Sequence, residues 1–97
     1  MATEVYALPP NEIVDLAVAL GLMTSRTYTI EVTFPRAAYA YLWERESELS
    51  ESEQAALQSG GHVLRWGYPR EMSLRSVDYW YVRNHTFSEI KIAVTQQ

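Results

Sequence analysis

The chain has 97 residues, of which 47% are hydrophobic and 21% charged, and its formal net charge is -4. This length suffices for one compact core, so we expect residues 1–97 to form a single compact domain. The absence of cysteine excludes disulfide frameworks, thiolate nucleophiles and zinc–thiolate sites. The net acidity argues against a protein that coats polyanions.

The first third of the chain predicts an arm, a helix and a strand. Residues 1–9 form the expected N-terminal arm. The helix is predicted over residues 11–21, with Asn11 as its cap, Gly21 as its stop, and apolar residues at helical spacing between them. Residues 27–34 then change to a period of two and predict a strand, whose apolar face carries Tyr28, Ile30, Val32 and Phe34.

A second helix is predicted from Pro35 to about Leu49. Proline suits the first turn of a helix, and the alanines at positions 37, 38 and 40 favour helix over strand. The same stretch also fits a strand, because its large aromatic residues alternate: Tyr39, Tyr41 and Trp43.

Ser50 and Glu53 form a capping box, which predicts that a third helix begins at Ser50 and ends at Gly60-Gly61. The rest of the chain predicts three strands, at residues 62–68, 73–83 and 87–95. The order α-β-α-α-β-β-β indicates an α+β fold. We expect a mostly antiparallel four-stranded sheet with two or three helices packed on one face.

The alternation in these strands predicts which side chains face the helices. Ile90, Ile92 and Val94 should point inward with the apolar face of residues 27–34. Burial of the Asp78 carboxylate would be costly, so Val77, Tyr79 and Tyr81 should point inward and Trp80 outward. Leu64 and Trp66 should likewise point inward, which leaves Arg65 beside Trp80 on the open face.

Two surfaces are therefore candidate partner-binding sites. The first is acidic, because residues 44–53 carry five of the twelve acidic side chains: Glu44, Glu46, Glu48, Glu51 and Glu53. The second is the open sheet face with Trp80 and Arg65, accompanied by Tyr68 and Arg70 from the connection between strands. Tryptophan and arginine dominate binding hot spots, and seven of the eight basic residues are arginine.

Catalytic chemistry has no sequence signature here. Histidine is the residue type that could act as a base near neutral pH, and neither His62 nor His85 has a partner at metal-ligand spacing. There is no G-x-S-x-G elbow, no S-x-x-K motif and no phosphate loop. We therefore expect no enzyme activity, no metal and no cofactor.

The leading interpretation is a nonenzymatic protein-interaction domain that binds a macromolecular protein partner. In size, acidity and lack of catalytic motifs the chain is similar to inhibitors carried by phages and mobile elements, such as the anti-CRISPR proteins. That resemblance implies inhibition of the bound partner. With no signal peptide and no apolar stretch that could cross a bilayer, a cytoplasmic location is the default.

Two alternatives remain, and a homodimer formed through the Trp80 face is compatible with all of them. Single-stranded nucleic acid could stack on Trp80, with Arg65, Arg70 and Arg75 on phosphates, although the net acidity argues against it. A small enzyme or ligand-binding domain could instead close a pocket around Tyr68, His62 and Tyr79.

Overall fold

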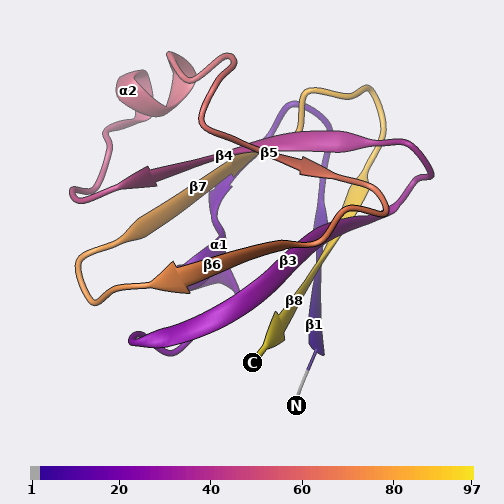
Figure 1. Ribbon diagram of the computed structural model, residues 1–97. Helices are drawn as coiled ribbons and strands as arrows, with labels where there is room; N and C mark the ends of the chain where they lie inside the picture. Colours follow the sequence, from indigo (N-terminus) through magenta and orange to yellow (C-terminus); the bar gives the residue numbers. More distant parts are fainter. Residues whose placement is uncertain (1–2) are drawn as a thin grey trace.

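The computed structural model describes residues 3–97, which form two four-stranded antiparallel sheets packed face to face (Figure 1). One sheet has the strand order β1 (Thr3–Leu8), β8 (Ile90–Gln96), β3 (Arg26–Phe34) and β6 (Arg70–Leu74). The other has the order β2 (Ile13–Asp15), β7 (Tyr79–Arg83), β4 (Tyr39–Arg45) and β5 (His62–Arg65).

The strand pairing follows a simple rule. β1 pairs with β8, β2 with β7, β3 with β6 and β4 with β5, as if one long hairpin were wrapped around a core. The hairpin is closed into two sheets by the further pairs β3 with β8 and β4 with β7. This is the jelly-roll topology, in which most connections cross from one sheet to the other.

The predicted α+β fold is therefore wrong. The helices of residues 3–97 are two short segments, α1 (Leu16–Ala19) and α2 (Glu51–Ala55), and neither forms a layer over a sheet. The expected N-terminal arm is strand β1 over residues 3–8, while residues 1–2 lie outside the described chain. No helix in the described part of the chain is long and apolar enough to span a membrane.

The largest single error concerns residues 35–49, where β4 replaces the predicted helix. Ala40 and Leu42 point into the core, while Tyr39, Tyr41 and Trp43 alternate with them on the outer face. β4 pairs with β5 on one side and β7 on the other. Helix propensity is a weak preference that such pairing overrides.

Other elements were predicted more closely. The strand at residues 27–34 is confirmed as β3, and the capping box is confirmed at the start of α2, which is much shorter than the helix expected there. The helix expected at residues 11–21 is divided into β2 and α1. The long strand expected at residues 73–83 is two strands, β6 and β7, separated by a turn.

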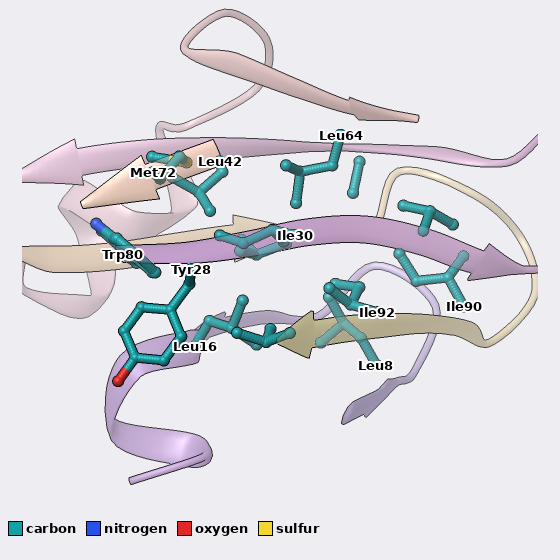
Figure 2. Packing of buried hydrophobic residues seen from close by; sticks show 14 of the residues in the cluster. Leu8, Leu16, Tyr28, Ile30, Leu42, Leu64, Met72, Trp80, Ile90 and Ile92 are labelled. Atoms are coloured by element: carbon teal, nitrogen blue, oxygen red, sulfur yellow. The ribbon is translucent and has the colours of Figure 1, made fainter. Parts of the chain in front are cut away.

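The core lies between the two sheets (Figure 2). The inward positions predicted in β3 and β8 are confirmed for Ile30, Val32, Ile90, Ile92 and Val94, which are at most 2% exposed. Removal of such apolar side chains from water is the dominant favourable term in folding, and in the core they pack closely.

Trp80 corrects the predicted faces of β7. It has no exposed area, and its indole meets the Tyr28 ring edge-on at 6.1 Å between the sheets (Figure 2). The prediction assumed that Asp78 and Trp80 lie on the same face of one strand. Asp78 instead lies in the turn before β7, where its carboxylate accepts hydrogen bonds from Arg75, so its charge does not determine which way Trp80 points. Val77 is exposed in the same turn.

The alternating strand directions sort the connections into two ends of the sandwich. The connections at residues 9–12, 35–38, 66–69 and 84–89 form what we call the loop end, on the right in Figure 1. The opposite end, which we call the α2 end, carries α1, α2 and the turn at residues 75–78.

Candidate functional site

A long connection lies over the outer face of the β2-β7-β4-β5 sheet at Trp43, Tyr81 and Arg83. Residues 46–61, here called the α2 segment, shield Trp43 and Tyr81, which are buried although they face away from the core. The Tyr81 hydroxyl accepts a hydrogen bond from Leu49 N, and Arg83 donates to two carbonyl oxygens of the α2 segment. At Gly61 a Cβ atom would lie 2.9 Å from the Trp43 ring, so only glycine permits this approach.

The half of this face nearer the loop end is open and forms a hollow of about 440 Å³. β4 and β5 supply its floor, and the connections at 35–38 and 66–69 supply its walls. Aromatic rings and small apolar side chains dominate the lining, with one guanidinium and no carboxylate. The lining residues are Ala37, Ala38, Tyr39, Tyr41, Val63, Arg65, Trp66 and Tyr68.

Several of these rings reach solvent. Tyr68 is 72% exposed, Tyr39 43% and Trp66 37%. Tyr39 meets Tyr41 edge-on at 5.7 Å, and the guanidinium of Arg36 lies 5.3 Å from the centre of the Trp66 ring. A concave group of exposed rings with few polar groups is the usual composition of a binding site.

The polar side chains that line the hollow have no ion-pair or hydrogen-bond partner among residues 3–97. Within residues 3–97 the basic side chains that contact a carboxylate are His62 and Arg75, so neither Arg65 nor Arg36 takes part in an ion pair. The tyrosine hydroxyls that form hydrogen bonds within the described chain are those of Tyr28 and Tyr81, neither of which lines the hollow. The hollow therefore offers hydrogen-bonding capacity that folding leaves unused.

Buried Asn84 ties the loop end together. Its Nδ2 donates to the carbonyl oxygens of Leu8, Pro9 and Ser88 at 2.8–3.2 Å, and its Oδ1 accepts from the backbone and hydroxyl of Thr86. These bonds join the connections at 9–12 and 84–89. A second tie, from Trp66 N to the carbonyl oxygen of Ala38, joins the two walls of the hollow.

His85 continues the aromatic row behind the hollow. Its ring lies 5.0 Å from Tyr41 and 6.4 Å from Trp43. Burial lowers the pKa of His85 below its ordinary value, and the charge of Arg83 lowers it further. His85 therefore favours its neutral form, and its buried Nε2 has no hydrogen-bond partner in the described chain.

The five glutamates of the predicted acidic surface have different roles. Glu44 binds His62, Glu46 binds Arg75, and Glu53 accepts from Ser50 N in the capping box. The hydrogen bonds from Ser50 lower the pKa of Glu53. Glu48 and Glu51 are exposed and form no ion pair within residues 3–97. Much of the charge in this run is thus engaged in local structure.

Glu44, His62 and Arg70 form a chain of hydrogen bonds across the edge between the sheets. His62 Nε2 lies 2.7 Å from Glu44 Oε1, and Arg70 NH2 lies 2.7 Å from His62 Nδ1. The tautomer that satisfies both contacts has Nε2–H donating to Glu44 and Nδ1 accepting from Arg70. Both ring nitrogens are occupied, so the imidazole acts here as a tie between β4, β5 and β6.

The second predicted surface does not exist as expected. Trp80 is in the core, Arg70 is held by His62, and Arg75 is held by Asp78 and Glu46. Arg75 lowers the pKa of Asp78, chiefly by side-chain hydrogen bonds. A dimer through Trp80 is excluded by the same burial.

Of the predicted site residues, Arg65 and Tyr68 are brought together in the hollow. The pocket predicted around Tyr68, His62 and Tyr79 is not formed, because the hollow contains neither of the last two. Trp66 was predicted to be buried and Tyr39 was assigned to a helix, so both were missed. The signal for them was the alternation of aromatic residues, which placed Tyr39 and Tyr41 on the face opposite Ala40.

No cluster of histidine, aspartate or glutamate suited to a metal ion occurs in residues 3–97. No protein-family model, curated protein or solved structure matches this chain.

Proposed function

We propose that this protein is a nonenzymatic binding module that holds a protein partner in the hollow at its loop end. The observation that carries the proposal is the composition of the hollow. Tyrosine, tryptophan and arginine line it, and lysine, aspartate and glutamate do not. These are the residue types enriched and depleted at the centres of protein interfaces.

The location supports the same function. Loops at one end of a β-sandwich are a common place for binding residues, because the sheets hold them in position. Tyr and Trp provide large contact areas at a low cost in side-chain entropy. The hydrogen bond from Trp66 N to the carbonyl oxygen of Ala38 joins the two walls of the hollow, which favours a preorganised interface.

Affinity capture from a host lysate tests the proposal when the wild type is compared with three variants. Tyr39→Ala with Tyr68→Ala removes two rings of the hollow. Glu48→Lys with Glu51→Lys reverses the unpaired charge of the α2 segment, and Thr29→Ala alters the outer face of the other sheet. Circular dichroism and thermal melts verify that each variant is folded.

The expected result is a protein captured by the wild type, by the glutamate variant and by Thr29→Ala, but not by the tyrosine variant. A protein that the tyrosine variant still captures, and that the glutamate variant loses, would contradict the proposal. Inhibition of the partner, as in the anti-CRISPR proteins, stays a prediction. Assays of the partner's activity with and without this chain test it.

Single-stranded nucleic acid is the second candidate, now at the hollow. Trp66 and Tyr68 would be the stacking platforms and Arg65 the phosphate contact. A titration of tryptophan fluorescence with a deoxythymidine twelve-mer at low salt tests it. The expected result is no saturable change.

A further inference from the structure

The charges around the hollow indicate what kind of partner it would accept. The lining contains a guanidinium and no carboxylate, and Arg36 adds a second cation at its wall. Arg36 already lies over the Trp66 ring, whereas Arg65 has no ion pair within the described chain. Arg65 is therefore the cation available to a ligand.

We infer that the hollow binds an acidic segment of the partner. Arg65 would bind a carboxylate of Asp or Glu, and Tyr39, Trp66 and Tyr68 would hold an adjacent apolar or aromatic side chain. This inference rests on the proposed function. Arginine matches a carboxylate with two parallel N–H···O bonds, and exclusion of water by the surrounding rings strengthens such bonds.

The free hydroxyls of the hollow fit the same ligand. The hydroxyl groups of Tyr39, Tyr41 and Tyr68 can donate to a carboxylate or to the backbone carbonyl groups beside it. The volume of about 440 Å³ accommodates a few side chains rather than a folded domain. A short segment is thus the part of the partner that would enter.

A polypeptide fits these charges better than a polynucleotide does. Binding along a phosphate backbone requires a row of available cations. Here Arg70 donates to His62, and Arg75 binds Asp78 and Glu46. The net charge of -4 opposes a long polyanion. One or two cations beside aromatic rings suit a local carboxylate.

Selection from a library of random twelve-residue peptides displayed on phage tests the inference. Wild type, Arg65→Glu, Arg26→Glu and the double variant Tyr39→Ala with Tyr68→Ala are each immobilised and screened in parallel. Arg26→Glu is the matched control, because this exposed arginine begins β3 at the α2 end and the change in net charge is the same.

The expected peptides carry Asp or Glu next to an aromatic or apolar residue. Synthetic versions should lose at least tenfold in affinity for Arg65→Glu and less than twofold for Arg26→Glu, and Arg65→Glu should select basic peptides instead. Arg65→Lys should give a smaller loss. Affinity for the wild type should fall as salt is raised, because the contact is electrostatic.

Four outcomes would overturn the inference. Peptides without acidic bias that lose affinity only for the tyrosine variant would refute the acidic partner and leave the proposed site intact. Binding that the tyrosine variant retains, or no enrichment on the wild type, would count against both proposals. If the wild type bound a deoxythymidine twelve-mer as tightly as it binds the selected peptides, the hollow would be a nucleic-acid site instead.

Discussion

The two ends of the sandwich use their polar side chains differently. At the α2 end, Glu46 and Asp78 share Arg75, and Glu53 caps a helix. At the loop end, Arg65 has no ion pair within residues 3–97 and the rings beside it are exposed. A high density of charge therefore marks local structure here, whereas unengaged side chains around a hollow mark the better candidate for binding.

Two tryptophans give the largest expected contrast. Trp80→Ala should reduce the free energy of unfolding by about 3–5 kcal/mol, because it empties the space between the sheets. Trp66→Ala should cost about 1 kcal/mol or less, because this ring is partly exposed at the loop end. Urea denaturation followed by circular dichroism measures both values.

Trp80→Phe serves as the control for this pair. It keeps an aromatic ring and removes the indole N–H, which is buried without a partner in the described chain, so it should cost less than Trp80→Ala. Equal losses of stability for Trp66→Ala and Trp80→Ala would refute the assignment of one to the surface and the other to the core.

Asn84→Asp tests how firmly the loop end is held. The substitution preserves shape but replaces the Nδ2 donor with a carboxylate oxygen facing three carbonyl oxygens. We expect a loss of about 3 kcal/mol or more in the free energy of unfolding. Asn11→Asp, at an exposed position of the same end, is the matched control and should change little. Similar values for the two would contradict the role given to Asn84.

Binding gives the next contrast, with a smaller energy. Trp66→Ala should weaken binding of the partner by about 2 kcal/mol, which is a roughly 30-fold increase in Kd, as expected for a central aromatic anchor. Glu48→Ala should leave Kd within about twofold, because Glu48 lies at the α2 end, away from the hollow, and charges outside the centre of an interface contribute little. Isothermal titration calorimetry with the captured partner measures both. If Glu48→Ala raised Kd more than Trp66→Ala does, the α2 end and not the loop end would be the binding site.

The smallest expected effect is the pH dependence due to His85. Its pKa is lowered in the folded state from an ordinary value of 6.5, so the unfolded chain takes up the proton first. The stability due to neutral His85 is therefore present above pH 6.5 and is lost as pH falls through the folded pKa.

His85→Phe keeps the contacts with Tyr41 and Trp43 and removes this titration. Between pH 5 and pH 7 the free energy of unfolding of the variant should change less with pH than that of the wild type. Urea denaturation at a series of pH values measures both. An unchanged slope would show that His85 titrates alike in the folded and unfolded states.

Local patterns in the sequence predicted some elements, and long-range pairing explains the errors. Alternation in residues 27–34 and the capping box at Ser50 depend on neighbouring residues, and both were predicted correctly. The division of residues 11–21 depends on β7, which is more than 60 residues away and pairs with Ile13–Asp15. No local pattern contains that information.

The candidate site shows the same limit. Arg65 and Tyr68, two of the predicted binding residues, line the hollow, whereas their predicted companion Trp80 lies in the core. The prediction assumed that only one face of β7 is buried. Both faces are buried, because the α2 segment covers Tyr81 on the outer side while Trp80 fills the core. Whether a segment covers the outer face of a strand depends on tertiary structure, and no alternation of apolar and polar residues in the sequence indicates it.

Hydrogen exchange of the complex between this chain and its captured partner tests the central claim most directly. If the loop end is the binding site, the partner should slow amide exchange in residues 37–41 and 63–68 and leave residues 46–53 unchanged. Slower exchange confined to residues 46–53, with no change around the hollow, would contradict it.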